Sequence, residues 1–206
     1  MTWRAAWVWA ALWPPLACAQ PASPPADDRI ELSGATLEME GGATVSVAQG
    51  RIARDGAGEG TDAAARLPGG DQPALDVTSD RTSWDLAAGT ARFAGSVVAT
   101  RGDLELRCEI LDVTLAAGSP PRIVAADAAG SVVVVRGAQT ARADQGALDA
   151  TRGLLVLTGS PQLTDGPHTM TGERIDVWLD DDRVECARCR VVLLGDIGAA
   201  EPDARP

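Results

Sequence analysis

The sequence contains no lysine and no tyrosine, and it has one phenylalanine and one histidine. All 18 basic side chains are therefore arginine, and they stand against 29 Asp and Glu, which gives a net charge of −11. This balance disfavours nucleic-acid binding, because phosphate contacts need an excess of Lys and Arg on one surface. Aromatic residues make up only 3%, so the core must be built from Val, Leu, Ile and Ala.

Signs of catalytic chemistry are also scarce. No Gly-x-Ser-x-Gly motif occurs, and the lone His168 has no placed partner for acid–base work. Asp180-Asp181-Asp182 lacks the interleaved pattern of a calcium loop and is typical of a solvated turn. The sequence predicts a protein that is not an enzyme and that holds no metal ion or cofactor.

The first 19 residues have the pattern of an export signal. Arg4 supplies the positive charge, residues 5–13 form a short apolar run, and Ala17-Cys18-Ala19 offers small residues for cleavage. Nine apolar residues rising about 1.5 Å each cannot span a bilayer core of about 30 Å. We expect an exported, periplasmic protein in an oxidising compartment, with lipidation of Cys18 as an alternative.

The rest of the chain favours an all-β fold. Short segments alternate apolar and polar residues, as half-buried strands do, and Gly and Asp separate them at hairpin-like positions. Residues 20–28 and 56–73 have the composition of linkers, and residues 195–206 that of a disordered tail. The predicted domain therefore spans residues 72–194, preceded by residues 20–71 as linker.

An internal repeat connects two parts of this domain. Shifted by 64 positions, residues 84–115 align without a gap on residues 148–179. The pairs Gly89/Gly153, Gly95/Gly159 and Gly102/Gly166 are identical and are expected at turns and bends where a positive φ or a missing Cβ is useful. A fainter copy at residues 29–56 predicts extra strands in the same sheet.

Three cysteines remain after the signal. Cys186 and Cys189 are expected to flank a tight strand-to-strand turn and to form a disulfide. The alternatives are a redox pair, or a zinc site that also uses Cys108 and His168. Cys108 lies on an alternating apolar segment and is predicted to be a small core residue.

The order of these pieces resembles the LptA/OstA family of periplasmic lipopolysaccharide-transport proteins (OstA-like domain). The resemblance is carried by Leu75-Asp76-Val77-Thr78-Ser79-Asp80, by residues 91–102, by Leu104-Glu105-Leu106, and by residues 154–159 and 171–175 of the second repeat. It implies a twisted open β-jelly roll with a V-shaped cross-section, built from repeated hairpin units. It also implies end-to-end self-association and partners of the same fold, LptC-like and LptD-like proteins.

The resemblance further implies that the apolar interior receives the acyl chains of lipid A. The candidate lipid-binding residues are Leu75, Val77, Phe93, Val97, Leu104, Leu106, Leu111, Val113, Val132, Val134, Leu155, Leu157, Ile175 and Val177. From the residues alone, the same side chains could form an ordinary dry core. The expected function is a periplasmic bridge that carries lipopolysaccharide between the two membranes. The alternatives are an LptC-like membrane-tethered component and a carbohydrate-active or adhesive β-solenoid.

Overall fold

A computed structural model describes residues 29–38, 42–68, 73–116, 118, 121–181 and 183–193. The predicted signal (residues 1–19) with Cys18, the linker at residues 20–28 and the tail at residues 195–206 lie outside the described residues. Within the described part, no helix is long and apolar enough to cross a membrane.

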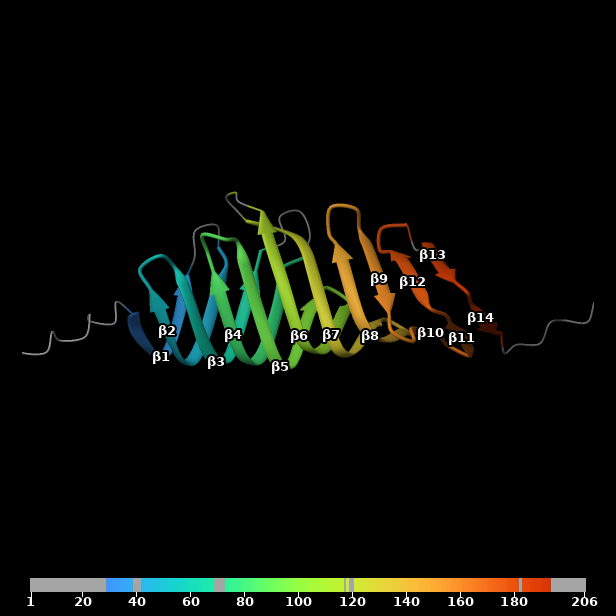
Figure 1. The fold of residues 1–206 in the computed structure, drawn as a ribbon, viewed down its shortest axis with the longest axis horizontal. Helices are drawn as coiled ribbons and strands as arrows, with labels where there is room; N and C mark the ends of the chain where they lie inside the picture. The colour runs from blue at the N-terminus through green and yellow to red at the C-terminus, as the bar shows by residue number, and fades with distance from the viewer. Residues whose placement is uncertain are drawn as a thin grey trace, which may run out of the picture.

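The described residues form one long antiparallel sheet of fourteen strands (Figure 1). Neighbours in the sheet follow chain order from β1 to β8, and beyond β8 the sheet divides into two branches, β9-β12-β13 and β10-β11-β14. The strands are β1 (Arg29–Glu38), β2 (Thr44–Ala53), β3 (Ala57–Leu67), β4 (Leu75–Asp85), β5 (Thr90–Arg101), β6 (Leu104–Ala116), β7 (Arg122–Arg136), β8 (Gln139–Asp149), β9 (Leu154–Thr158), β10 (Gln162–Asp165), β11 (His168–Thr171), β12 (Arg174–Trp178), β13 (Arg183–Ala187) and β14 (Arg190–Val192).

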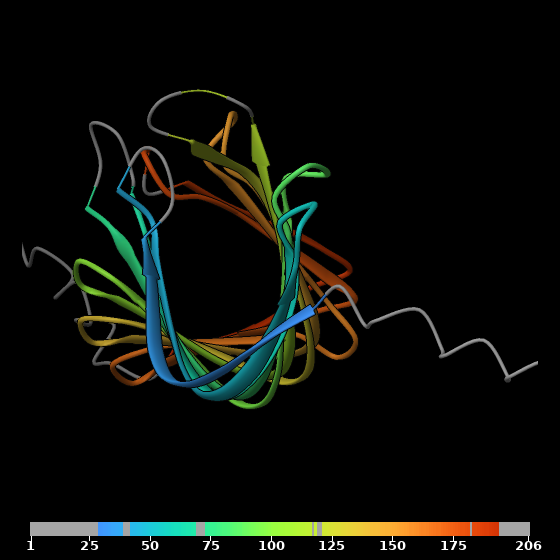
Figure 2. The same ribbon diagram turned by 90° about the vertical axis from the view of Figure 1, so that its left-hand side faces the viewer.

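Each long strand bends once near its middle, where the register against its neighbour shifts. The bends divide the sheet into two walls that curve around a common interior, joined in the lower part of Figure 2. We call the space between them the trough. Wall A comprises residues 49–53, 57–61, 81–85, 90–94, 110–116, 122–129 and 145–149 with β9, β12 and β13. Wall B comprises residues 44–47, 63–67, 75–79, 97–101, 104–108, 132–136 and 139–143 with β10, β11 and β14.

The bends depend on a repeated glycine-serine pair in the left-handed backbone region. Both residues have positive φ at 82° and 47° (Gly95-Ser96), 80° and 49° (Gly130-Ser131), and 76° and 55° (Gly159-Ser160). An acidic side chain of the neighbouring strand, Asp80, Glu109 or Asp144, crowds each glycine. The positive φ expected for all three repeated glycine pairs is confirmed, since Gly89, Gly102, Gly153 and Gly166 also lie in this region. The repeat is therefore one of backbone shape.

Gly95→Ala is expected to lower the free energy of unfolding by about 2–3 kcal/mol, because a side chain at this φ is strained. The new Cβ would also lie 3.0 Å from Asp80 Cβ. Gly137→Ala is the matched control, since Gly137 has a φ of 58° and nothing within 4 Å of its would-be Cβ. The control should lose about 1 kcal/mol from backbone strain alone. Equal losses in urea unfolding would show that the contact with Asp80 does not matter.

The sheet begins earlier than the sequence suggested. The extra strands expected at residues 29–56 are present, as β1 and β2 pair with each other. The prediction of a linker at residues 56–73 was wrong, because Ala57–Leu67 forms β3, paired with both β2 and β4. Its glycines hide the strand pattern: Trp84 packs over Gly58 and Val47 over Gly60, so the neighbouring strands supply the inward-facing bulk.

Antiparallel pairing throughout the described strands argues against the β-solenoid, whose coils stack short repeats along one axis. Two walls that share one interior are instead the expected open jelly roll.

Candidate functional site

An uninterrupted row of apolar side chains follows the inner face of wall B. The residues of this row are register partners on successive strands, and all of them are apolar from one end of the described sheet to the other. We call this set the wall B row; its members are Leu37, Val45, Ala65, Val77, Ala99, Leu106, Val134, Ala141, Leu163, Met170 and Val191. Eleven strands thus present one apolar face to the trough.

Wall A carries a corresponding row. Its register partners are Ile52, Gly58, Trp84, Ala91, Val113, Ala126, Leu148, Leu155, Val177 and Val184. The two rows face one another across the trough, so a molecule lying along it would touch apolar surface on both sides.

Three hollows follow one another between the walls in chain order. The first, of about 440 Å³, is lined by residues of β2 to β6 and their connecting turns that include Val45, Trp84 and Phe93. The second, of about 220 Å³, is lined by residues that include Leu75, Leu106 and Leu111. The third, of about 60 Å³, lies among Val134, Leu155 and Val177. The hollows therefore become smaller toward the C-terminal strands.

The candidate lipid-binding residues all face the trough, in two groups. Eight border a hollow: Leu75, Phe93, Leu104, Leu106, Leu111, Val134, Leu155 and Val177. Six border none of the three hollows and pack as the floor, each at most 1% exposed: Val77, Val97, Val113, Val132, Leu157 and Ile175. The interior thus combines closely packed side chains with open hollows between the walls.

Several residues that border the hollows were not among the candidates. Val45 lies on a strand that the sequence showed only as a faint copy of the repeat, and Leu67 lies in the segment that was predicted to be a linker. Trp84 and Leu115 lie near the ends of β4 and β6. Further apolar examples are Ile123, Leu148, Leu163, Leu179 and Val184. Extending the two-residue alternation of Leu111 and Val113 would have found Leu115. Trp84 is out of phase with Leu75 and Val77, because the register of β4 shifts between Thr78 and Arg81.

A disulfide joins Cys186 to Cys189 across the last bend of the sheet. The turn expected there is not a hairpin, since β13 pairs with β12 and β14 pairs with β11. Arg188 has a φ of 51° at this bend, and its Nη1 lies 2.6 Å from Glu173 Oε1. At this bend, the disulfide and the ion pair take the place of the glycine-serine pair that forms the other bends. Glu173 is the acidic neighbour here, as Glu109 is at the Gly130-Ser131 bend.

Cys108 is a buried residue of wall B, as expected. Burial raises the pKa of its thiol to about 11, so the thiol stays protonated and unreactive near neutral pH. Among the described residues, no three His, Cys, Asp or Glu side chains gather in a way that could hold a metal ion.

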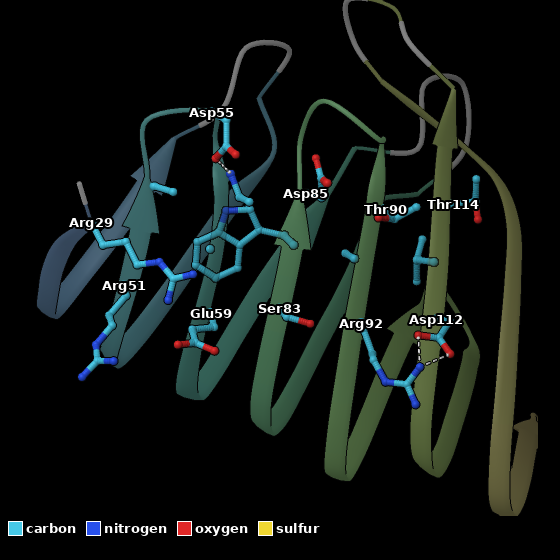
Figure 3. Close-up of a pocket in the computed structure, with 16 residues that line it drawn as sticks. Arg29, Arg51, Asp55, Glu59, Ser83, Asp85, Thr90, Arg92, Asp112 and Thr114 are labelled. Atoms are coloured by element: carbon cyan, nitrogen blue, oxygen red, sulfur yellow. Dashed lines mark hydrogen bonds and ion pairs between the residues drawn. The ribbon is translucent and has the colours of Figure 1, made fainter. Parts of the chain in front are cut away.

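The outer face of β1 to β6 holds a separate depression of about 640 Å³ (Figure 3). Arg51, Glu59, Ser83, Arg92 and Asp112 are successive cross-strand partners along it. Arg92 Nη1 donates hydrogen bonds to both carboxylate oxygens of Asp112, at 3.0 and 3.1 Å. Both side chains are largely exposed, so Arg92 and Asp112 form a solvated ion pair on the outside of the trough.

An open antiparallel jelly roll whose two walls enclose an apolar trough defines a class of carriers for lipid-like molecules. Residues 76–183, slightly more than half of the chain, match the family described as LptA/(LptD N-terminal domain) LPS transport protein. The chain belongs to this family and is a lipopolysaccharide transport protein. Membership of a transport family also confirms the expectation of a carrier rather than an enzyme.

A solved structure supports the fold. The chain is similar to LptH, the LptA homologous periplasmic component of the conserved lipopolysaccharide transport device from Pseudomonas aeruginosa. The TM-score is 0.55 at 17% identity, and the match covers 61% of this chain and 97% of LptH. No curated protein matches the sequence.

Proposed function

We propose that this chain carries lipopolysaccharide through the periplasm by burying its acyl chains between wall A and wall B. The single observation that carries the proposal is the wall B row, which remains apolar from β1 to β14. A lipid can therefore move from one strand to the next without exposing its chains to water, and the protein needs to supply no chemistry.

The energy of burial is large enough for this task. Removing a twelve-carbon chain from water gains on the order of 10 kcal/mol, at about 0.8 kcal/mol per CH₂. The first hollow has the volume typical of a ligand pocket, and it is lined mostly by apolar side chains. Because the row is apolar at every strand, no polar side chain interrupts the path of the acyl chains along it.

Lipid that co-purifies with the exported protein tests the proposal. Mass spectrometry of the protein isolated from its own envelope should detect lipopolysaccharide, and mild extraction should leave the chain folded by circular dichroism. A protein isolated with no lipid, and unable to take up lipopolysaccharide added in detergent, would contradict the proposal.

The ends of the sheet support end-to-end assembly with a second copy or with LptC-like and LptD-like proteins. β1 pairs only with β2, while β13 and β14 each have one neighbour among the described strands. Exposed apolar side chains mark both ends: Ile30 is 62% exposed and Leu193 is 71% exposed. Unpaired strand edges with apolar side chains favour strand addition by another chain.

If copies of the chain associate head to tail, substitutions at the two edges of the sheet should have a specific effect. Ile30→Asp and Leu193→Asp should each abolish self-association in sedimentation, because each damages one side of the same interface. An equimolar mixture should form a one-to-one dimer and nothing larger, since one intact edge of each kind remains. Leu86→Asp, at an exposed turn away from both edges, is the control. Self-association of either variant alone would contradict head-to-tail assembly.

We place the protein in the periplasm because of the export signal, and as a bridge rather than an LptC-like tether because residues 1–19 end in a cleavage pattern. Protein sequencing of the mature N-terminus separates the two, since a bridge begins after residue 19 and a tethered component retains its apolar segment or a lipid on Cys18.

A further inference from the structure

The inner face of wall B becomes polar at its rim. One step outward from the wall B row, Arg101, Leu104, Arg136 and Gln139 follow one another as register partners on β5, β6, β7 and β8. Arg101 and Arg136 stand two residues beyond Ala99 and Val134, so both point toward the same side of the sheet. Two arginines therefore lie beside an otherwise apolar track.

Both arginines border the second hollow, together with Leu75, Leu106 and Leu111. Arg136 also borders the third hollow. A charged group at the edge of an apolar hollow suits a ligand with an apolar part inside and an anionic part at the opening.

Oxygen atoms contact both guanidinium groups, and one of these contacts crosses from wall B to wall A. Arg136 Nη1 donates a hydrogen bond of 3.3 Å to the carbonyl oxygen of Leu179, in the turn between β12 and β13 of wall A. Arg136 Nε lies 3.4 Å from Asp103 Oδ2, and Arg101 Nε donates to the carbonyl oxygen of Pro73 at 3.3 Å. Burial lowers the pKa of Arg101, and the nearby charge of Asp180 raises it. Both arginines are thus held at the rim by oxygen acceptors.

We propose that Arg101 and Arg136 form a binding site for a phosphate group on the sugar headgroup of the lipid whose acyl chains occupy the trough. The proposal rests on the proposed function, because the chains hold the headgroup at this rim. In a chain with a net charge of −11, Arg101 and Arg136 bring two positive charges together at the same hollow, where an anion can replace the neighbouring carboxylates.

The geometry suits this ligand. β5 and β7 are two strands apart, roughly 10 Å at about 4.8 Å per strand, so both long side chains can reach one phosphate between them. A guanidinium matches phosphate oxygens with paired N–H donors. Phosphate would replace the contacts with Asp103 and Asp180, and neither arginine would be left without a negative partner.

The test compares two lipids with identical acyl chains, phosphorylated lipid A and its dephosphorylated form, bound to the full mature chain. Arg101→Gln and Arg136→Gln should each weaken binding of the phosphorylated lipid about tenfold. Both should leave the dephosphorylated lipid within about twofold, because its acyl chains still fill the same hollow. Asp180→Asn should strengthen binding of the phosphorylated lipid, since it removes a competing carboxylate.

Two control variants test whether the effect on binding depends on the charge of Arg101 and Arg136 or on a structural role of their side chains. Arg107→Gln removes an arginine from the exposed outer face of wall B and should change neither affinity. Arg136→Lys keeps the charge without the paired donors and should recover part of the lost affinity. Inorganic phosphate at millimolar concentration should not compete, because it brings no acyl chain.

Equal weakening for both lipids would overturn the proposal and make the arginines braces between the walls. Unchanged affinity for phosphorylated lipid would also overturn it, and competition by inorganic phosphate would show a site for the free anion. If neither lipid binds the unmodified protein, the proposed function fails instead, which distinguishes the two outcomes.

Discussion

Phe93→Asp is expected to lower the affinity for lipopolysaccharide by at least about a hundredfold. Phe93 is 1% exposed, lies on wall A and borders the first hollow. A carboxylate there would lie without a partner among apolar side chains, and burying such a charge costs several kcal/mol. Because a factor of ten corresponds to about 1.4 kcal/mol, the expected loss exceeds two decades. Titration with a fluorescent lipopolysaccharide measures it.

Two further variants separate loss of binding from loss of folding. Ser83→Asp adds the same charge to the exposed outer face, opposite Arg92, and should bind as the unmodified chain does. Phe93→Ala removes bulk without adding charge, so it should lower stability by about 3–5 kcal/mol yet keep binding, since the hollow only grows. If Phe93→Ala loses binding as completely as Phe93→Asp while its circular dichroism stays β-rich, charge is not the cause.

The alternation of apolar residues made most of the fold predictable. A half-buried strand repeats every two residues whatever its partner, so segments such as Leu104-Leu106-Cys108 identify their inner face without any knowledge of topology. The repeated glycines added the bends, because few other residues accept their backbone angles. Together, the alternation and the glycine positions indicate which half of a strand lies on wall A and which half lies on wall B.

Strand β3 could not be found in the same way. Its inward positions include Gly58, Gly60, Ala63 and Ala65, which carry almost no apolar signal. The bulk that fills the interior above them comes from Val47 and Trp84 on the neighbouring strands. Because the side chains that fill the interior here belong to neighbouring strands, β3 can be recognised only once its pairing with them is known.

The division of the candidate site into floor and hollow was equally hidden. Val97 and Leu104 have the same alternation on adjacent strands, yet one packs at the bend and the other borders two hollows. The difference depends on how the side chains of the two walls pack against each other, which the alternation within one strand does not contain. The rim arginines were missed for a related reason, since Arg101 and Arg136 end their strands and look like ordinary solvated charges.

Photo-crosslinking from neighbouring positions is expected to give an all-or-none contrast. Leu155 and Val156 are adjacent apolar residues of β9, but Leu155 borders the third hollow while Val156 pairs with Asp176 on the other face. A photo-reactive residue at Leu155 should yield lipopolysaccharide adducts after irradiation in the native envelope, and one at Val156 should yield few. Hydrophobicity is nearly matched in this pair, so only the direction of the side chain differs.

The same contrast should recur along the trough. Phe93 and Leu106 should form adducts, while their neighbours Arg92 and Glu105 on the outer face should not. Adducts at all three inner positions would mean that lipid travels the length of the trough, because these residues belong to different hollows. Adducts confined to Phe93 would restrict lipid to the widest hollow. Equal yields on both faces would place the lipid on the outside of the sheet and leave the interior as a core.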